Sequence, residues 1–299
     1  SMIRKINGKI YFNFDMSSLT WLKTGGRADV FFIPSSLSDL KNFLMQLDVN
    51  IPIYLLGGGS NTLFRDNGFY GVVIKLDKSF DYINFMNDNE VKVGAATNCI
   101  KLARILAKNG KAGLEFFSGI PGSVGGAIKM NAGAYGNETS EFLSKIKIID
   151  RKGSIKEILA SKYKMNYRET NFPKEYIFLE GTFKRLKNLN TSKNLKKISE
   201  LVELRKNTQP ISEKTSGSTF KNPKDIKAWK IIKDSGCGKL KVGKASLSEM
   251  HSNFIINKGG ATSSNIEDLG EEIIKKVWNK HGIKLDWEIR IVGRRNTGG

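Results

Sequence analysis

The chain has 299 residues, of which 39% are hydrophobic and 26% are charged. This length allows one large domain or two to three smaller ones, and no apolar run approaches the roughly 20 residues needed to cross a bilayer. The formal net charge is +20, but the lysines are spread along the whole chain without a basic tail or a nucleic-acid-binding motif. We therefore expect no specific nucleic-acid partner. The first residues lack the apolar segment of a secretory signal, which predicts a cytoplasmic protein.

Hydrophobic periodicity predicts mostly strands in the first quarter of the chain. Apolar residues at helical spacing behind Ser36, a good N-cap residue, predict one helix. In chain order, the elements are a turn and strand at 19–33, the helix at 36–47, and strands at 51–56 and 71–76. A glycine-rich loop at 57–61 separates the last two strands, and the turn-forming residues 66–68 argue against a helix directly after that loop.

Further along, helices and strands are mixed without a strict βαβ alternation. The patterns predict strands at 91–97 and 176–186, a hairpin at 145–158, and helices at 98–109, with Gly110 as a left-handed cap, and 195–205. This mixture predicts an α+β fold and not a doubly wound sheet.

The last third of the chain carries two more helical patterns. Ile226, Trp229 and Ile232 form an apolar stripe that stops at Gly236. Ser264 and Glu267 form a candidate capping box. The core face of the helix that follows consists of Ile266, Leu269, Ile273, Val277 and Trp278, and a strand at 288–293 closes the chain.

The first glycine-rich loop directly follows a predicted strand. Because glycine lacks a β-carbon, its backbone can approach a ligand closely, and successive amides can face a phosphate. The dinucleotide fingerprint is absent, since no helix pattern follows, and a plain glycine turn explains the motif equally well. The candidate cofactor contacts in this loop are Gly57, Gly58, Gly59, Ser60 and Asn61.

A longer glycine-rich stretch covers residues 113–136. It retains apolar residues such as Val124 and Ile128, whereas an ordinary loop would be more polar. This mixture suits a backbone packed against a flat apolar ligand such as a flavin ring, and the alternative is a tightly packed sheet corner. The candidate cofactor contacts here are Gly119, Ile120, Pro121, Gly122, Ser123, Gly125 and Gly126.

Further motifs extend this pattern over nearly the whole chain. In order they are TGG (24–26), LGGGSN (56–61), GLEF (113–116), GIPGSVGGA (119–127), MNAGAYG (130–136), YRET (167–170), SGSTFKNP (216–223), EMHSNFIIN (249–257) and LDWEIRIVG (285–293). A single glycine motif is a weak signal, but this ordered set is specific. It resembles the UDP-N-acetylenolpyruvoylglucosamine reductases, which act in bacterial peptidoglycan precursor synthesis.

The resemblance implies a vanillyl-alcohol-oxidase-type (PCMH-type) FAD-binding fold of two subdomains, followed by a C-terminal α+β substrate-binding domain. The expected boundaries are 1–76, 77–206 with a closing strand at 286–296, and 207–285. It also implies that NADPH reduces the FAD, which then reduces an enolpyruvyl ether on a UDP-sugar. We expect a monomer without a membrane partner.

Two details set this chain apart within the family pattern. Thr62 stands where the family usually has the first of two leucines, which can change packing near the cofactor. Only a short segment separates Arg168 from the strand at 176–186, so the resemblance is to the form that lacks a tyrosine-bearing insertion there.

The resemblance also assigns catalytic roles to Arg168, Ser218 and Glu288. A guanidinium can grip a carboxylate with two parallel hydrogen bonds, and a serine hydroxyl can protonate only a strongly basic carbanion. A protonated glutamate can hydrogen-bond an enolate, which requires burial to raise its pKa. Without the resemblance, the sequence would predict only a surface arginine, a serine in a turn and an exposed glutamate in a strand. The candidate substrate contacts are Tyr167, Arg205 and Asn222.

Two other functions remain open on the residues alone. One is an oxidase of the same flavoprotein type, although no histidine or cysteine lies in or just before the first glycine loop to tether the flavin covalently. The other is a basic nucleic-acid-binding protein without catalysis, which would be colourless and bind DNA with steep salt dependence. The two cysteines and two histidines suggest neither a disulfide framework nor a metal site.

Overall fold

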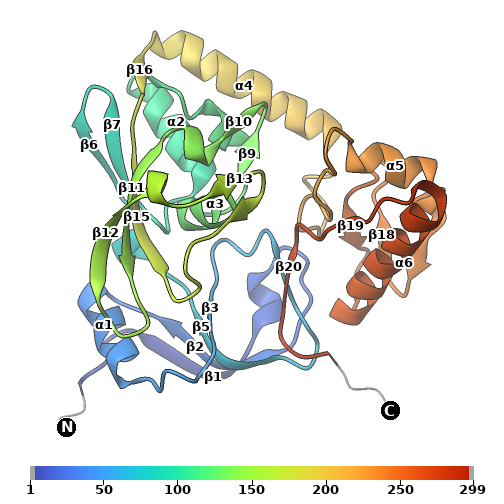
Figure 1. Ribbon diagram of the computed structural model, residues 1–299, viewed down its shortest axis with the longest axis horizontal. Helices are drawn as coiled ribbons and strands as arrows, with labels where there is room; N and C mark the ends of the chain where they lie inside the picture. Colours follow the sequence, from blue (N-terminus) through green and yellow to red (C-terminus); the bar gives the residue numbers. More distant parts are fainter. Residues whose placement is uncertain (1–3, 296–299) are drawn as a thin grey trace. The chain divides into compact units, whose positions relative to one another are not determined.

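The computed structural model describes residues 4–295 (Figure 1). The contacts within this part of the chain divide it into two units. The first unit consists of 4–11, 31–58 and 72–204, and the second unit consists of 12–30, 59–71 and 205–295. Among these residues, no helix combines the length and the apolar character that crossing a bilayer requires. The mixture of helices with largely antiparallel sheets confirms the α+β prediction.

The N-terminal strands form a four-stranded sheet in the order β1-β2-β5-β3. The predicted helix at 36–47 is confirmed, and the Ser36 hydroxyl accepts a hydrogen bond from the Asp39 amide at 3.1 Å. The elements of this part are β1 (Lys9–Asp15), η1 (Met16–Leu19), β2 (Arg27–Ile33), α1 (Leu37–Gln46), β3 (Ile53–Leu55), β4 (Thr62–Phe64) and β5 (Phe69–Ile74).

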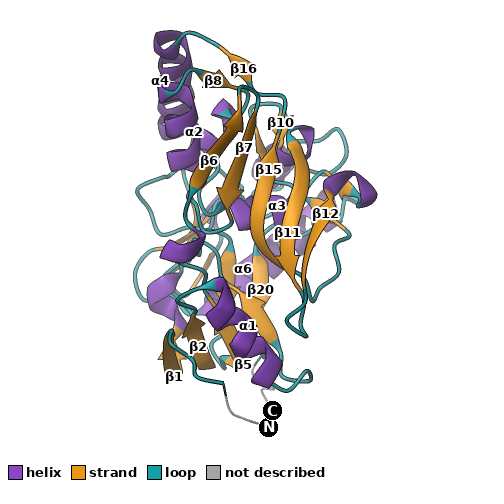
Figure 2. Ribbon diagram, turned by 90° about the vertical axis from the view of Figure 1, so that its left-hand side faces the viewer, coloured by secondary structure: helices purple, strands orange, loops and turns teal. Residues whose placement is uncertain are grey.

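A five-stranded antiparallel sheet in the order β12-β11-β15-β7-β6 forms the centre of the first unit (Figure 2). The predicted hairpin at 145–158 is confirmed by the pairing of β11 with β12. The elements are η2 (Lys78–Phe80), β6 (Ile83–Asn87), β7 (Glu90–Gly94), β11 (Leu143–Ile149), β12 (Ile155–Leu159) and β15 (Ile177–Phe183).

Helices and short strands complete the first unit, and α4 continues into the second. The predicted helix at 98–109 is confirmed, with Asn98 as its N-cap and Gly110 in the left-handed conformation, φ +68°. The elements are α2 (Cys99–Lys108), β8 (Lys111–Ala112), η3 (Glu115–Gly119), α3 (Val124–Met130), β9 (Gly133–Ala134), β10 (Asn137–Glu138), η4 (Thr139–Glu141), η5 (Ala160–Lys162), β13 (Met165–Asn166), β14 (Glu169–Thr170), β16 (Lys187–Asn188) and α4 (Thr191–Thr208).

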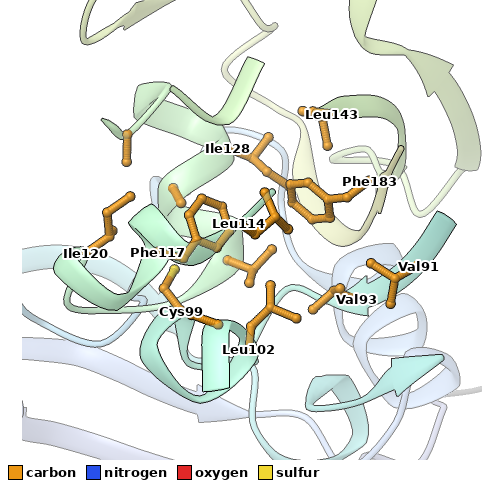
Figure 3. Close-up of a cluster of buried hydrophobic side chains, with 14 of the residues drawn as sticks. Val91, Val93, Cys99, Leu102, Leu114, Phe117, Ile120, Ile128, Leu143 and Phe183 are labelled. Atoms are coloured by element: carbon orange, nitrogen blue, oxygen red, sulfur yellow. The ribbon is translucent and has the colours of Figure 1, made fainter. Parts of the chain in front are cut away.

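The core of the first unit lies between this sheet and the helices α2 and α3. Val91 and Val93 of β7, Leu102 of α2 and Ile128 of α3 are all fully buried in one cluster (Figure 3). Phe117 meets Phe183 edge to face at 5.8 Å between ring centroids. This packing fixes α3, which contacts β15 and β7, and therefore fixes the glycine loop that precedes it.

Asn194 of α4 is a buried polar residue with a clear expected effect on stability. It is 0% exposed, and neither side-chain polar atom has a hydrogen-bond partner within the described part of the chain. An unsatisfied buried amide costs about 1–3 kcal/mol. Asn194→Leu, which keeps the number and branching of heavy atoms, should therefore raise the unfolding midpoint by several degrees in thermal denaturation followed by circular dichroism. A lower midpoint than wild type would show that the amide is satisfied.

The second unit is built on a three-stranded sheet, β17-β18-β19, covered by α6. β20 pairs in parallel with β4, so that Ile291 lies opposite Leu63. The division into three domains stays a prediction. The elements are α5 (Ala228–Asp234), η6 (Cys237–Lys239), β17 (Lys241–Val242), β18 (Ala245–Leu247), β19 (Ile255–Asn257), α6 (Ser263–His281) and β20 (Arg290–Val292).

The predicted start of α6 is wrong by two residues. The capping box is formed by Thr262 and Asn265. In addition, the amides of Ser263 and Ser264 donate to the carboxylate of Asp66 at 2.9 Å each. Glu267, the predicted second residue of the box, forms a salt bridge of 2.7 Å with Arg65 instead.

Two tryptophans assigned to core faces lie at the surface. Trp278 is 56% exposed and Trp229 is 38% exposed, whereas Ile266, Leu269, Ile273 and Val277 of α6 are buried as predicted. A tryptophan at the edge of an apolar stripe can leave the core when the neighbouring helical positions already fill it.

Candidate active site

A cleft in the first unit brings parts of the two glycine-rich segments together. Its cavity volume is about 140 Å³, and the cleft opens to solvent, so a longer ligand can extend out of it. The predicted residues that line it are Gly57, Gly58, Gly122, Ser123, Gly125 and Gly126. The other lining residues were not predicted from the sequence; they are Leu55, Leu56, Lys75, Leu76, Ala95, Ala96, Asn98, Lys129, Tyr176 and Phe178.

The two glycine loops approach each other too closely for a side chain on Gly57 or Gly58. A β-carbon on Gly58 would lie 2.8 Å from the α-carbon of Gly122, and one on Gly57 would lie 2.7 Å from the Ser123 hydroxyl oxygen. Only glycine fits at Gly58 without displacing the second loop. Gly122 itself has φ +104°, a backbone conformation that L side chains rarely adopt.

The second loop is anchored mainly by its own amides. Those of Val124 and Gly125 donate to the carbonyl oxygens of Thr97 and Ala95 at 2.9 Å each, so they are not free for a ligand. Ser123 caps α3 by accepting from the Gly126 amide at 3.2 Å. The glycines in this loop therefore allow the backbone to come close to a ligand, and they contribute less through amide hydrogen bonds to it.

An added β-carbon distinguishes the glycines of this loop from one another. On Gly125 it would lie 3.1 Å from the Ala95 β-carbon, whereas on Gly126 the nearest described atom outside the backbone of its own helix is the Ser123 oxygen, at 3.4 Å. Gly126 lines the cleft and is exposed, so a larger side chain there would fill the space that a cofactor needs. The bare backbone and apolar walls of this cleft fit FAD.

Not all predicted residues line this cleft. Ile120 belongs to the buried core of the first unit, and a β-carbon on Gly119 would lie 2.5 Å from the ring of Tyr135. Both residues pack within the protein. Pro121, between them and Gly122, is half-buried.

The remainder of the first loop belongs to the second unit. A β-carbon on Gly59 would collide with the carbonyl oxygen of Leu19, Ser60 is buried, and the Asn61 side chain donates to the Glu288 carbonyl oxygen at 3.1 Å. Thr62, the departure from the family pattern, is buried in β4 opposite Arg290.

Arg168 lies in the two-residue turn of the hairpin formed by β13 and β14. Its φ is +53°, a left-handed conformation that only about a few per cent of non-glycine residues adopt. Its guanidinium donates to the Gly133 carbonyl oxygen at 2.9 Å and lies 4.9 Å from the ring centroid of Tyr167. Backbone strain of this kind is common at functional sites.

The C-terminal end of α3 holds this hairpin in place. The buried Asn131, itself left-handed with φ +46°, donates through its side chain to the Asn166 carbonyl oxygen at 2.9 Å. The Thr170 hydroxyl donates to the Lys129 carbonyl oxygen at 2.5 Å. One helix therefore connects the cleft, which Gly125 and Gly126 line, with the arginine turn.

Ser218 and Glu288 lie on neighbouring segments of the second unit. The Glu288 amide donates to the carbonyl oxygen of Thr219 at 2.9 Å, directly beside Ser218. Asn253 fixes the serine segment from its other side by accepting from the Phe220 amide at 3.1 Å and donating to the Phe220 carbonyl oxygen at 2.9 Å. Ser218 and Glu288 are both half-buried, so each keeps access to solvent or a ligand.

The other predicted substrate contacts have defined partners in the second unit. The Arg205 side chain donates to the Gln209 side chain at 3.3 Å. The Asn222 side-chain oxygen accepts from the Ala228 amide at 2.9 Å, at the start of α5. The helix thereby orients the Asn222 amide group.

Comparisons with known proteins agree with these features. The model of the C-terminal domain of UDP-N-acetylenolpyruvoylglucosamine reductase matches residues 209–292, and that of an FAD binding domain matches residues 28–159. A UDP-N-acetylenolpyruvoylglucosamine reductase of Rickettsia bellii is 40% identical over 98% of this chain and 97% of its own length. Another, of Rickettsia typhi, is 41% identical over 98% and 99%, respectively.

A solved structure extends the likeness to three dimensions. The crystal structure of UDP-N-acetylenolpyruvylglucosamine reductase from Thermus caldophilus matches with a TM-score of 0.83 and 29% identity, covering 97% of this chain and 100% of that one. The fold is therefore the vanillyl-alcohol-oxidase-type FAD-binding fold with a C-terminal domain, and FAD is the cofactor. Because its sequence identity to these reductases extends over nearly the whole chain, the protein belongs to the UDP-N-acetylenolpyruvoylglucosamine reductase family.

Proposed function

We propose that this protein reduces the enolpyruvyl ether of UDP-N-acetylglucosamine enolpyruvate to the lactyl ether of UDP-N-acetylmuramate, with NADPH as the reductant. Family membership supports the reaction. The observation that carries it is the hydrogen bond between the Glu288 amide and the Thr219 carbonyl oxygen, which holds Glu288 beside the segment of Ser218. These two residues are the proposed acids of one reaction.

The substrate alkene gains a hydride on its terminal carbon and a proton on the carbon that bears the carboxylate. Bound FAD, once reduced, supplies the hydride. Charge then develops on the carbon next to the carboxylate and spreads into it, as in an enolate. The residues of this chain must hold that carboxylate, stabilise its charge and deliver the proton.

Arg168 is the proposed carboxylate ligand. Its guanidinium is charged at any relevant pH and can donate two parallel hydrogen bonds. The contacts with Gly133 and the Tyr167 ring orient it before the substrate binds. Preorganised donors of this kind stabilise developing charge without having to reorient during the reaction.

Ser218 is the proposed proton donor, and Glu288 the proposed donor to the enolate oxygen. Gly217, with φ +74°, turns the chain just before Ser218, and the contacts of Asn253 fix the segment after it. We also propose that the protein is of the form without the tyrosine-bearing insertion. The proposed substrate contacts are Tyr167, Arg205 and Asn222. The monomeric state and the cytoplasmic location stay predictions.

The proposal is tested by supplying substrates separately without oxygen. NADPH should bleach the yellow protein, and UDP-N-acetylglucosamine enolpyruvate should restore the colour while UDP-N-acetylmuramate appears in chromatography. If oxygen, supplied to the reduced protein in place of the enolpyruvyl sugar, restores the colour faster than that sugar does, the protein is an oxidase of the same fold. A colourless purified protein with steeply salt-dependent DNA binding would support the nucleic-acid alternative.

The FAD is expected to be bound without a covalent link. No histidine or cysteine lines the cleft as described, and the nearest thiol along the chain, Cys99, is buried, which raises its pKa and keeps it from forming a thiolate. Precipitation with acid should therefore leave the yellow colour in the supernatant. Colour that stays in the pellet after washing would overturn this expectation.

Glu288 provides a test of the proposed charge stabilisation. If its protonated form donates to the enolate, Glu288→Gln keeps a donor at the same position and should retain more activity than Glu288→Ala. The alanine variant should lose about 10²- to 10³-fold in the rate of sugar reduction. Rates of the second half-reaction, measured by stopped-flow absorbance, give the comparison. Equal losses in the two variants would exclude a donor role.

A further inference from the structure

Lys75 is a cleft residue that neither the glycine motifs nor the proposed reaction explains. It follows β5 directly, lines the cleft and is half-buried. Its ammonium donates to the carbonyl oxygen of Gly57 at 2.9 Å, at the start of the first glycine loop. This contact uses only one of its three protons, so two donors remain.

The charge of Lys75 lacks a close counterion in the described structure. No carboxylate among residues 4–295 lies within ion-pair distance of its ammonium, and the cleft lining contains Lys75 and Lys129 but neither aspartate nor glutamate. Burial lowers the pKa of Lys75 below its ordinary value, against the opposite effect of Asp77. A charge removed from water without a partner is unfavourable.

The surroundings of Lys75 leave room for an anion. Gly57 and Gly58 present bare backbone in the same cleft. Gly126 also lines the cleft and has no side chain that would occupy the space of a ligand. FAD carries a diphosphate between its adenosine and its flavin, and a lysine ammonium is a common partner of phosphate oxygens. An anionic ligand in this cleft would supply the missing counterion.

We infer that Lys75 binds a phosphate of the FAD diphosphate, and that its charge makes this cleft prefer FAD to flavins without a phosphate. The inference rests on FAD binding and is independent of the proposed reaction. It gives Lys75 two contacts, one to the Gly57 carbonyl oxygen and one to the cofactor, so that the first glycine loop and the diphosphate share a single cation.

The test is the affinity of flavin-free protein for FAD and for riboflavin, measured by quenching of flavin fluorescence. Lys75→Gln keeps an amide donor for Gly57 and removes the charge, whereas Lys75→Arg keeps the charge. Lys101→Gln is the matched control, because Lys101 is half exposed, pairs with Asp81 at 3.1 Å and does not line the cleft.

Lys75→Gln should weaken FAD binding about 10- to 100-fold, the range expected for one hydrogen bond to a charged group. Riboflavin binding should change less than about 3-fold, Lys75→Arg should retain most of the FAD affinity, and the control should match wild type. Added salt should weaken FAD binding less in Lys75→Gln than in wild type.

Three results would overturn the inference. FAD and riboflavin binding weakened to the same extent would mean that Lys75 only holds the glycine loop through Gly57. Unchanged FAD affinity would mean that the diphosphate binds elsewhere. If Lys75→Gln leaves FAD binding intact but raises the NADPH concentration needed to bleach the protein, the phosphate partner belongs to NADPH.

Discussion

Ser218→Ala is expected to slow reduction of the enolpyruvyl sugar by at least about 10²-fold, the usual loss when a positioned acid is removed. The rate at which NADPH bleaches the protein should remain nearly unchanged, since that step involves no protonation of carbon. Stopped-flow absorbance resolves the two steps. Arg168→Met should slow the same second step, because it removes the partner of the developing charge.

The serine segment itself offers a matched control. Ser216 lies two residues earlier, and its buried hydroxyl has no hydrogen-bond partner among the described residues. Ser216→Ala should therefore leave both steps close to wild type. Ser218→Cys should retain part of the activity, because a thiol can still donate a proton. If Ser218→Ala slows both steps equally, the serine is structural and the proton donor lies elsewhere.

Gly126→Val is expected to produce protein that is almost free of FAD. Its side chain would enter the cleft, since among the described residues, apart from the chain neighbours and the backbone of α3 itself, only the Ser123 oxygen lies within 4 Å of the added β-carbon, at 3.4 Å. We expect the FAD affinity to fall by at least about 10²-fold, equivalent to roughly 2.7 kcal/mol. The ratio of flavin to protein absorbance and the affinity of the flavin-free protein for FAD measure the effect.

Gly238→Val controls for the loss of a glycine as such. Gly238 is exposed and lies outside the cleft, and apart from its chain neighbours no described residue comes within 4 Å of its added β-carbon, so this variant should bind FAD normally. Gly58→Val should also lose FAD, but by displacing the second loop, and should lower the unfolding midpoint as well. A Gly126→Val protein that keeps full flavin occupancy would show that FAD does not occupy this part of the cleft.

Local sequence signals predicted the regular elements well where the pattern was amphipathic. The helix behind Ser36 and the one ending at Gly110 are both confirmed, because a cap residue and an apolar stripe agree there. The start of α6 was misassigned because Asp66, about 200 positions earlier, binds the first amides of that helix. A contact at this sequence separation leaves no mark in the local pattern.

The cleft was only partly predictable for the same reason. The paired glycines revealed both loops, but α3 was missed, since Gly125 and Gly126 disfavour a helix in isolation. The Ser123 cap and packing against β15 outweigh that preference. Lys75 carried no signal of its own, because a lysine after an apolar strand usually reaches solvent. Only the fold brings it to Gly57.

The short helix α3 works as a fixed spacer between two sites of the first unit. Its seven residues span about 10 Å at 1.5 Å per residue, from the glycines that line the cleft to the residues that hold the Arg168 turn. Inserting or deleting one residue between Ser123 and Asn131 would rotate the far end by about 100° and shift it along the axis. We therefore expect related sequences to keep this segment at constant length, whereas the turn at 150–154 should tolerate insertions.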